Sequence, residues 1–315
     1  MTTETARATI LDRDPAPGQI REHFADSLAL VREVTNYGSN LIPRSFVSSE
    51  RTVIDIVIIG VLLKHAVTML DAIELLVSQG AIFAAHLQAR SLFEARLYLT
   101  WILEKDTDRR ARQFFVARKR EDAMWATRSI PGTPQHESFR QVCGDLLADA
   151  KATDFEQDAI QQLKELDELF ADPEYLQITQ EFDRLKRRDR DYDVAWYQPW
   201  GPTSIADMAS RLGLSGEYTL FYHIFSRAAH CQEFRRHIAS DGKVLNFQAI
   251  RYLDGIDTLL RLSLSYALHI YRMILNRYRP AELENYARKY ATDWQARFRS
   301  IRGVKYNVTK TGEAV

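Results

Sequence analysis

The chain has 315 residues, of which 46% are hydrophobic and 27% are charged, a balance typical of a globular protein. Its 42 basic residues are offset by 42 acidic ones, so the net charge gives no general argument for binding nucleic acid or an anionic membrane. The two cysteines, Cys143 and Cys231, are too few for a disulfide framework or a zinc site, and they suit a reducing compartment.

The beginning of the chain and its most apolar stretch both bear on membrane targeting. Residues 1–18 are polar, include Pro15 and Pro17, and contain no apolar signal-peptide core, so we expect a flexible segment there. The stretch "VIDIVIIGVLLKHAVTML" is interrupted by Asp55, Lys64 and His65 before it reaches the ~20 apolar residues of a membrane span. We therefore expect a soluble, cytoplasmic protein without a membrane partner.

Apolar residues recur at helical spacing along most of the chain. Helices are expected over 19–40, where "GSNLIP" ends the first of them, over 50–79, with a break near Gly60, and over 81–104. An amphipathic helix over 104–130 and a loop over 131–138 follow. The remaining helices are expected within 139–152, 154–171 and 172–193, and then over 204–213, 217–237, 247–278 and 280–300.

Strand signals are weak by comparison. The only short alternation of apolar and polar residues is "KVLNF", beside a hairpin-like segment at 239–246, and no repeat is visible. The predicted fold class is therefore all-α: one bundle-like domain of about ten helices over 19–305, with at most a short hairpin, followed by a flexible tail over 306–315. A division near 131–138 is the less favoured alternative, because neither half carries a self-sufficient pattern.

Several common catalytic and cofactor motifs do not occur in this sequence. There is no GxxxxGK[ST], GxGxxG, GxSxG or HExxH, and no Glu-x-x-His pair of the kind found in di-iron bundles. We therefore expect neither a cofactor nor a bound metal.

A polar line crosses the apolar helix "AIFAAHLQARSLFEARLYLTWIL" at 81–103. His86, Arg90 and Glu94 follow one another at intervals of four residues, which places them on one helical face. A buried charge is costly unless it is paired and hydrogen-bonded, so these side chains need polar partners.

A second polar line lies in "EYTLFYHIFSRAAHCQEFRRH". Tyr222, Ser226 and His230 also stand four residues apart, beside His223 and Arg227. We expect the two lines to face each other and to form one polar pocket. The alternative is structural: Arg90 and Glu94 would be an ion pair that fixes the helix register, and Ser226 and His230 a hydrogen-bonded core pair. The spacing of these residues is equally compatible with a polar pocket and with two structural pairs.

Three other features are expected to be structural. The basic runs at 109–120 and 184–190 are typical of solvated helix faces, although either would steer a phosphate backbone if it flanked the pocket. Trp196, Tyr197 and Trp200 are expected to anchor a connecting loop rather than to stack on a base. The apolar stripe at 252–278 is expected to be core, with His269 as a hydrogen-bonded core histidine, and any exposed part of it would suit a homodimer contact.

The motifs resemble a bacterial all-helical family known only as a domain of unknown function. The resemblance rests on "ARSLFEA" at 89–95 and on the later pattern that contains Trp200, "SIADMASRLGL", Tyr218, Tyr222, Ser226 and His230. It covers about residues 19–275 and implies an all-helical fold without implying an activity.

The sequence is more distantly similar to HEPN domains, helical bundles that often act as metal-independent RNases in phage-defence and toxin systems. Their signature is an Arg followed by a His after four to six intervening residues. No Arg–His pair here has that spacing, since only two residues separate Arg227 from His230. The resemblance therefore implies this catalysis only if Arg90 supplies the cation from another helix.

Two functional hypotheses follow from these observations. In the first, the protein is a metal-independent RNase: His230 is the acid or base, Arg90 holds the phosphate and Glu94 orients Arg90 or His86, while His86, Tyr222, Ser226 and Arg227 complete the binding site. In the second, a non-catalytic helical module uses the same residues to bind a small anionic ligand or a protein partner. Access to Arg90 and His230 distinguishes them, because a structural network would be sealed beneath Phe93, Trp101 and Phe221.

Overall fold

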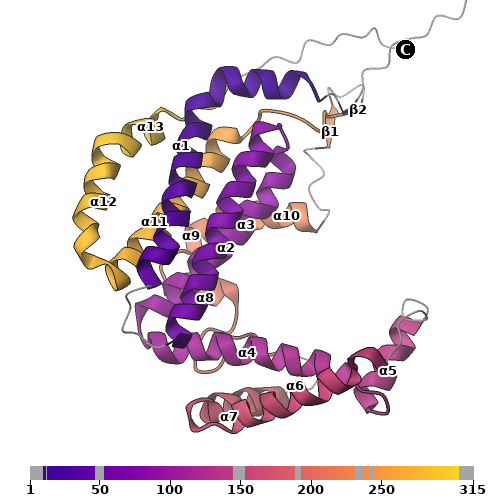
Figure 1. The fold of residues 1–315 in the computed structure, drawn as a ribbon. Coiled ribbons are helices and arrows are strands. Elements are labelled where there is room, and N and C mark those ends of the chain that lie inside the picture. Colours follow the sequence, from indigo (N-terminus) through magenta and orange to yellow (C-terminus); the bar gives the residue numbers. More distant parts are fainter. Residues whose placement is uncertain are drawn as a thin grey trace, which may run out of the picture. The chain divides into compact units, whose positions relative to one another are not determined.

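The computed structural model describes residues 10–11, 13–46, 53–144, 153–188, 193–230, 237–240 and 245–304. Most of these residues are helical (Figure 1). The chain divides into two compact units: unit 1 comprises residues 1–50, 59–103 and 209–315, and unit 2 comprises residues 51–58 and 104–208.

Unit 1 is built on four long helices that lie side by side (Figure 1). These are α1 (Pro15–Phe46), α2 (Val53–Ser78), α3 (Ile82–Glu104) and α11 (Ile256–Tyr278). The shorter elements of unit 1 are α9 (Ser215–Glu217), the π-helical η2 (Tyr218–Tyr222), α10 (His223–Ala229), β1 (Ile238–Ser240), β2 (Leu245–Phe247), the 3-10 segment η4 (Pro280–Glu282), α12 (Leu283–Lys289), the π-helical η5 (Tyr290–Trp294) and α13 (Gln295–Ser300).

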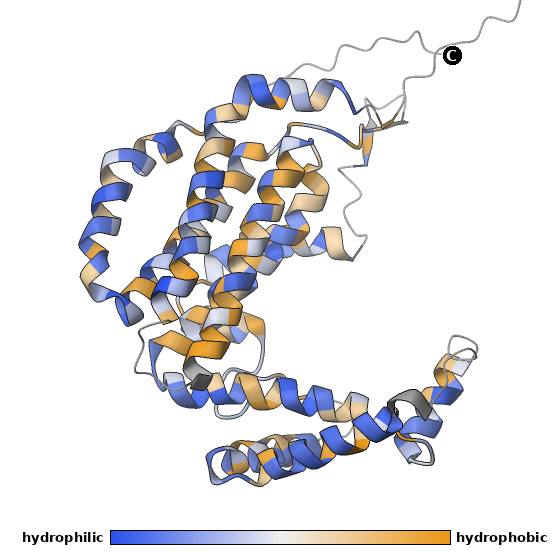
Figure 2. Ribbon diagram, in the orientation of Figure 1, coloured by the Kyte–Doolittle hydropathy of each residue, from blue (hydrophilic) through white to orange (hydrophobic). Residues whose placement is uncertain are grey.

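The core of unit 1 lies between the four long helices, where their apolar faces meet (Figure 2). Ile20, Leu63, Phe93 and Ile270, one from each helix, are fully buried. Helix α1 packs along α11, and at Gly38 an added Cβ would overlap the Tyr271 hydroxyl oxygen.

Helix α2 is the most apolar element of the chain. From Ile56 to Ser78 it is long and apolar enough, by length and composition, to cross a membrane. Core helices of large bundles meet the same two criteria, and within unit 1 the side chains of Leu63 and Leu70 are fully buried. Glu74 of this helix is also buried and forms an ion pair with Arg32 of α1.

Unit 2 is organised around α4 (Thr107–Arg128), which packs against α5 (Pro134–Cys143), α6 (Thr153–Ala171) and α7 (Pro173–Arg188). Its hydrophobic cluster joins Val116 of α4 to Tyr175, Ile178 and Phe182 of α7. The connector after α7 leads to α8 (Ile205–Arg211), which Ser204 caps by accepting a 3.1 Å hydrogen bond from the Asp207 amide.

Two residues of the connector anchor it, as the sequence predicted. The Trp196 ring meets Phe114 edge-on with 5.1 Å between ring centroids, and both Trp196 and Tyr197 are buried. Trp200 is instead 43% exposed, and the Arg109 guanidinium lies 5.6 Å from its ring centroid.

The predicted all-α fold class is confirmed, including the short hairpin, in which Ile238 pairs with Phe247 and Ser240 with Leu245. The flexible segments predicted at the two ends fall largely outside the described residues, namely at 1–9, 12 and 305–315. The structure places the first helical turn at Pro15, before the predicted start at Gln19.

Packing or turn chemistry explains four of the predicted boundaries that were wrong. Helix α1 continues through "GSNLIP" with Pro43 inside its last turn, which Leu41 and Ser45 hold in the core. Helix α2 is unbroken at Gly60, which faces the ring of Phe46.

The other two boundaries concern α5 and α11. Pro134 begins α5 instead of extending a loop, because Thr133 accepts a 3.1 Å hydrogen bond from the His136 amide as N-cap. Helix α11 begins at Ile256 rather than near residue 247, directly after Gly255, whose φ of 77° is left-handed.

Candidate functional site

Arg90 joins the two polar lines that the sequence predicted to meet. Its Nε donates to the Ser226 hydroxyl over 3.1 Å, and its terminal nitrogen donates to the Tyr222 hydroxyl over 2.7 Å. The guanidinium carbon also lies 4.9 Å from the centroid of the Tyr222 ring. Arg90 therefore connects α3 to η2 and α10.

Glu94 completes this network from one helical turn further along α3. Its carboxylate lies 3.1 Å from the Arg90 guanidinium and accepts a 2.8 Å hydrogen bond from the Tyr222 hydroxyl. Burial raises the pKa of Tyr222, and the neighbouring charge of Glu94 raises it further, against the opposing effect of Arg90. The phenol therefore stays protonated at neutral pH and remains a hydrogen-bond donor to Glu94.

The network opens onto a hollow beside α10. Its volume is about 550 Å³, within the range of small-molecule sites, which is roughly 300–1,000 Å³. We call it the α10 hollow, and it is lined by Arg90, Thr219, Tyr222, His223, Ser226, Arg227 and His230. Two arginines, two histidines and three hydroxyl groups thus share one wall, and no carboxylate belongs to the lining. Such a wall suits an anion.

The hollow is accessible to solvent at its α10 side. His223, Arg227 and His230 are exposed, whereas the Arg90 and Glu94 side chains are 28% and 20% exposed. Phe93 and Trp101 are buried in α3 and do not belong to the hollow's lining. Phe221 is only partly buried and does not line the hollow either, so the sealing beneath these aromatic side chains that the structural alternative implies is not observed.

His86 differs from the other members of its line. It is buried, and its ring stacks on Phe225 with 5.1 Å between ring centroids. It therefore contacts α10, as its helical face predicts, but it does not line the hollow. The buried Phe225 occupies the position opposite His86, between the polar residues Tyr222 and Ser226 of the second line.

The expected helix over 217–237 has an irregular start and an earlier end. The π-helical η2 precedes α10, and π-helical turns are found frequently at functional sites. Helix α10 ends at Ala229, and His230 follows it as C-cap, its amide donating to the Ser226 carbonyl over 3.2 Å. His230 therefore enters the hollow from a helix end, and residues 231–236 lie outside the described part of the chain.

Two features at this site were not predicted from the sequence. Thr219 lines the hollow three residues before Tyr222 and seven before Ser226, a helical spacing that would have identified it. Arg96, which is buried on α3, forms an ion pair with Glu217 directly before η2 and lies 5.0 Å from the Tyr266 ring centroid. This pair extends the antiparallel contacts of α3 with the segment that carries Tyr222.

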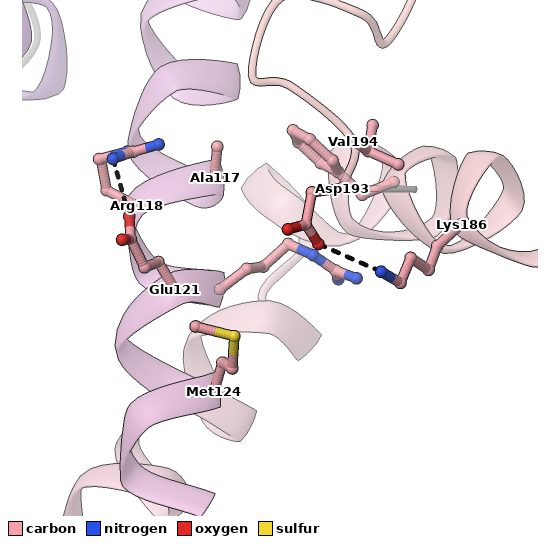
Figure 3. Close-up of a pocket in the computed structure, with 9 residues that line it drawn as sticks. Ala117, Arg118, Glu121, Met124, Lys186, Asp193 and Val194 are labelled. Atoms are coloured by element: carbon pink, nitrogen blue, oxygen red, sulfur yellow. Dashed lines mark hydrogen bonds and ion pairs between the residues drawn. The ribbon is translucent and has the colours of Figure 1, made fainter. Parts of the chain in front are cut away.

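The two basic runs contribute to a different hollow, which belongs to unit 2 (Figure 3). It has a volume of about 460 Å³ and is lined by residues of α4 and α7 together with Asp193 and Val194. Arg118 pairs with Glu121 at 2.7 Å and Lys186 with Asp193 at 3.3 Å. These carboxylates offset the basic charge, which agrees with the predicted role of solvated helix faces.

The apolar stripe at 252–278 forms core in part. Leu259, Tyr266 and Ile270 are buried, but His269 is exposed, so the prediction of a core histidine was wrong. The homodimer contact that this stripe suggested stays a prediction. Within the described ranges, no group of three or more His, Cys, Asp or Glu side chains is arranged to hold a metal ion.

Comparisons with known proteins yield one family. Neither a curated protein nor a solved structure matches the chain. A family model described as a family of unknown function (DUF5677) matches residues 55–244, which is more than half of the chain and includes α3, η2 and α10. This match confirms the predicted domain of unknown function, while the likeness to HEPN domains stays a prediction. The chain belongs to the family of unknown function DUF5677.

Proposed function

We propose that the protein is a metal-independent RNase that binds a phosphodiester in the α10 hollow. One observation carries this proposal: Arg90 and His230 line the same solvent-accessible hollow, together with His223 and Arg227. A fixed cation beside imidazole groups is what acid–base cleavage of RNA requires.

The proposed roles follow from the positions of the side chains. Arg90, oriented by Glu94 and Tyr222, and Arg227 hold the non-bridging phosphate oxygens. Arg227 is exposed in the lining of the hollow, and among the described residues no carboxylate pairs with it. His223 and His230 stand about 10 Å apart along the helix, given a rise of about 1.5 Å per residue, and they flank Ser226 and Arg227. A phosphate above Ser226 would therefore have an imidazole on either side.

The proposed reaction is transesterification within the RNA chain. One imidazole removes the proton of a ribose 2′-hydroxyl, whose oxygen forms a bond to the adjacent phosphorus. The bond from phosphorus to the 5′-oxygen breaks, and the other imidazole, in its protonated form, donates a proton to that oxygen. The products are a 2′,3′-cyclic phosphate and a 5′-hydroxyl end, and the arginines stabilise the charge of the phosphorane.

RNA cleavage in EDTA tests this proposal. The wild-type protein should cleave structured and unstructured RNAs and leave 2′,3′-cyclic phosphate ends. His230→Ala should lower the rate at least about 100-fold, the lower end of the usual contribution of acid–base catalysis. His23→Ala is the matched control, because His23 is an exposed histidine of α1, and it should cleave like wild type. Cleavage that EDTA abolishes, or that survives in His230→Ala, would refute the mechanism.

A non-catalytic binding module is the second candidate. One observation favours it: Arg90 already has three protein partners, Ser226, Tyr222 and Glu94. In this case Arg90 would help to bind an anionic ligand, and no bond of that ligand would be cleaved. In that case, 2′-O-methyl RNA would bind to the wild-type protein and more weakly to Arg227→Ala, while unmodified RNA stays intact.

A further inference from the structure

Unit 1 contains a second hollow, which is lined by α11 and by the C-terminal elements α12, η5 and α13. Its volume is about 730 Å³, larger than that of the α10 hollow. Ser265, His269, Arg272 and Asn276 line it from α11, and Tyr290 and Phe298 line it from η5 and α13. We call it the α11 hollow.

The α11 side of this hollow is a polar helical face. Ser265, His269, Arg272 and Asn276 follow one another at intervals of three or four residues, so they share one side of the helix. Other positions of α11, such as Ile270 and Ile274, are fully buried in the core. The polar face therefore contributes nothing to the core: its four residues are exposed and line the α11 hollow.

No described side chain forms an ion pair or a hydrogen bond with Arg272, which lines this hollow. Several basic neighbours are instead engaged: Arg279 pairs with Glu282, Lys289 and Arg297 both pair with Glu33, and Arg288 donates to Asn285. An exposed guanidinium at the edge of a cavity, without a carboxylate partner, is suited to bind a phosphate or carboxylate through two hydrogen bonds.

His269 adds an uncharged hydrogen-bonding group next to Arg272. Partial desolvation lowers the pKa of His269, and the positive charges of Arg96 and Arg272 lower it further, against the opposing effect of Glu217. The imidazole is therefore neutral at physiological pH and has both a donor and an acceptor nitrogen. With Asn276 it offers the mixed hydrogen-bonding edge that a heterocyclic base needs.

The opposite wall supplies aromatic surface. Tyr290 is the first residue of the π-helical η5, and Phe298 lies on α13 one turn beyond Trp294. The buried Tyr286 fixes α12 against α11, since its hydroxyl donates to the Leu268 carbonyl over 2.7 Å. Glu284 of α12 also lines this hollow and would accept a hydrogen bond from an amino group.

We propose that the α11 hollow binds a nucleoside monophosphate. Arg272 would bind the phosphate, Tyr290 or Phe298 would stack on the base, and Asn276 and Glu284 would bond to the base edge. This site shares no lining residue with the α10 hollow, so the proposal does not depend on RNA cleavage.

Calorimetric titration with AMP tests the proposal, with adenosine and ribose 5-phosphate as probes that lack the phosphate or the base. The full-length protein should bind AMP with one-to-one stoichiometry and bind both fragments more weakly. Arg272→Gln and Tyr290→Ala should each weaken AMP binding by about tenfold or more, as expected for a charge-assisted hydrogen bond or a base stack.

Two control variants locate the binding site. Arg288→Gln replaces a nearby exposed arginine of α12 outside the hollow and should bind AMP like wild type. Arg227→Ala removes a cation from the lining of the α10 hollow and should also leave AMP binding unchanged. Absence of AMP binding by folded wild-type protein, or loss of binding in Arg227→Ala but not in Arg272→Gln, would overturn the proposal. Circular dichroism melting of each variant shows whether it is folded.

Discussion

The guanidinium of Arg90 donates a 2.7 Å hydrogen bond to the hydroxyl of Tyr222, which lies 132 residues further along the chain. The same guanidinium reaches Ser226 through Nε and Glu94 through its terminal nitrogens. Three acceptors thus surround one planar group. Arginine satisfies such an arrangement with its fixed fork of donors, whereas the lysine ammonium is a single compact charge.

Arg90→Lys should therefore behave almost as poorly as Arg90→Ala. We expect both variants to lose RNA cleavage or RNA binding, because neither holds a planar cation against Tyr222 and Ser226. Arg90→Ala should also lower the free energy of unfolding by about 1–3 kcal/mol, since it removes a partner of the partly buried Glu94. Urea denaturation and a cleavage assay provide the two measurements. Wild-type function in Arg90→Lys would exclude the proposed phosphate contact.

The direct contact between Arg90 and Tyr222 should appear as an energetic coupling. A double-mutant cycle with Arg90→Ala and Tyr222→Phe should give a coupling of about 0.5 kcal/mol or more in unfolding free energy. The matched cycle pairs Arg90→Ala with Glu33→Gln, which shares none of its bonding partners, and should be additive within about 0.5 kcal/mol. Additivity in both cycles would mean that the contact between Arg90 and the Tyr222 hydroxyl contributes no measurable coupling.

The meeting of Arg90 with Tyr222 and Ser226 was predictable because helical periodicity assigns residues to faces. Intervals of four residues identified both polar lines, and the cost of leaving charges unpaired in an apolar helix predicted that they would pair with each other. The contacts of Arg90 and Glu94 agree with this reasoning. Periodicity does not determine which turns are irregular, so neither the π-helical η2 nor the end of α10 before His230 was foreseen.

Helix boundaries that depend on tertiary packing could not be predicted from the sequence either. Pro43 and Gly60 are helix-breaking signals when only local preferences are considered. In the structure, buried neighbours such as Leu41 hold the last turn of α1, and the Phe46 ring packs against Gly60. His269 of α11 was wrongly predicted to be buried for the same reason. Which positions of α11 are buried depends on elements that are remote in the sequence.

His86 should be required for stability but not for the activity of the α10 hollow. Its ring is buried and stacks on Phe225, so His86→Ala should lower the free energy of unfolding by about 1–3 kcal/mol. RNA cleavage measured well below the melting temperature should match that of the wild type, because His86 does not line the hollow. A loss of cleavage in a well-folded His86→Ala variant would show that the residue acts in the site.

Glu33 should make the stability of unit 1 depend on acidic pH. Hydrogen bonds from Lys289 and Arg297 outweigh desolvation and lower its pKa from 4.5 to about 2. A carboxyl group whose pKa is lower in the folded state stabilises the protein fully above its unfolded value, and this contribution is lost as the pH falls from about 4.5 to 2.

Glu33→Gln should accordingly lower the free energy of unfolding by about 1 kcal/mol at pH 7, a modest amount because the pair is partly solvated. At pH 3 the difference between variant and wild type should have fallen by more than half. Urea denaturation at the two pH values measures this difference. Glu22→Gln, on an exposed position of α1, should show no such difference at either pH. A pH-independent effect of Glu33→Gln would show that charge is not its cause.

Two glycines of the same helix should respond to alanine in opposite directions. An added Cβ at Gly38 would lie 2.1 Å from the hydroxyl oxygen of Tyr271, a fully buried residue of α11, so either the ring or the helix must move. Gly38→Ala should therefore destabilise the protein by at least about 1–3 kcal/mol, as overpacked cores do. Gly18 of α1 has no atom within 4 Å of an added Cβ, and Gly18→Ala should stabilise by about 0.4–1 kcal/mol through the unfolded state and helix propensity. Thermal and urea denaturation of the two variants measure both effects. A stabilising Gly38→Ala would show that α1 and α11 do not approach each other as closely as described.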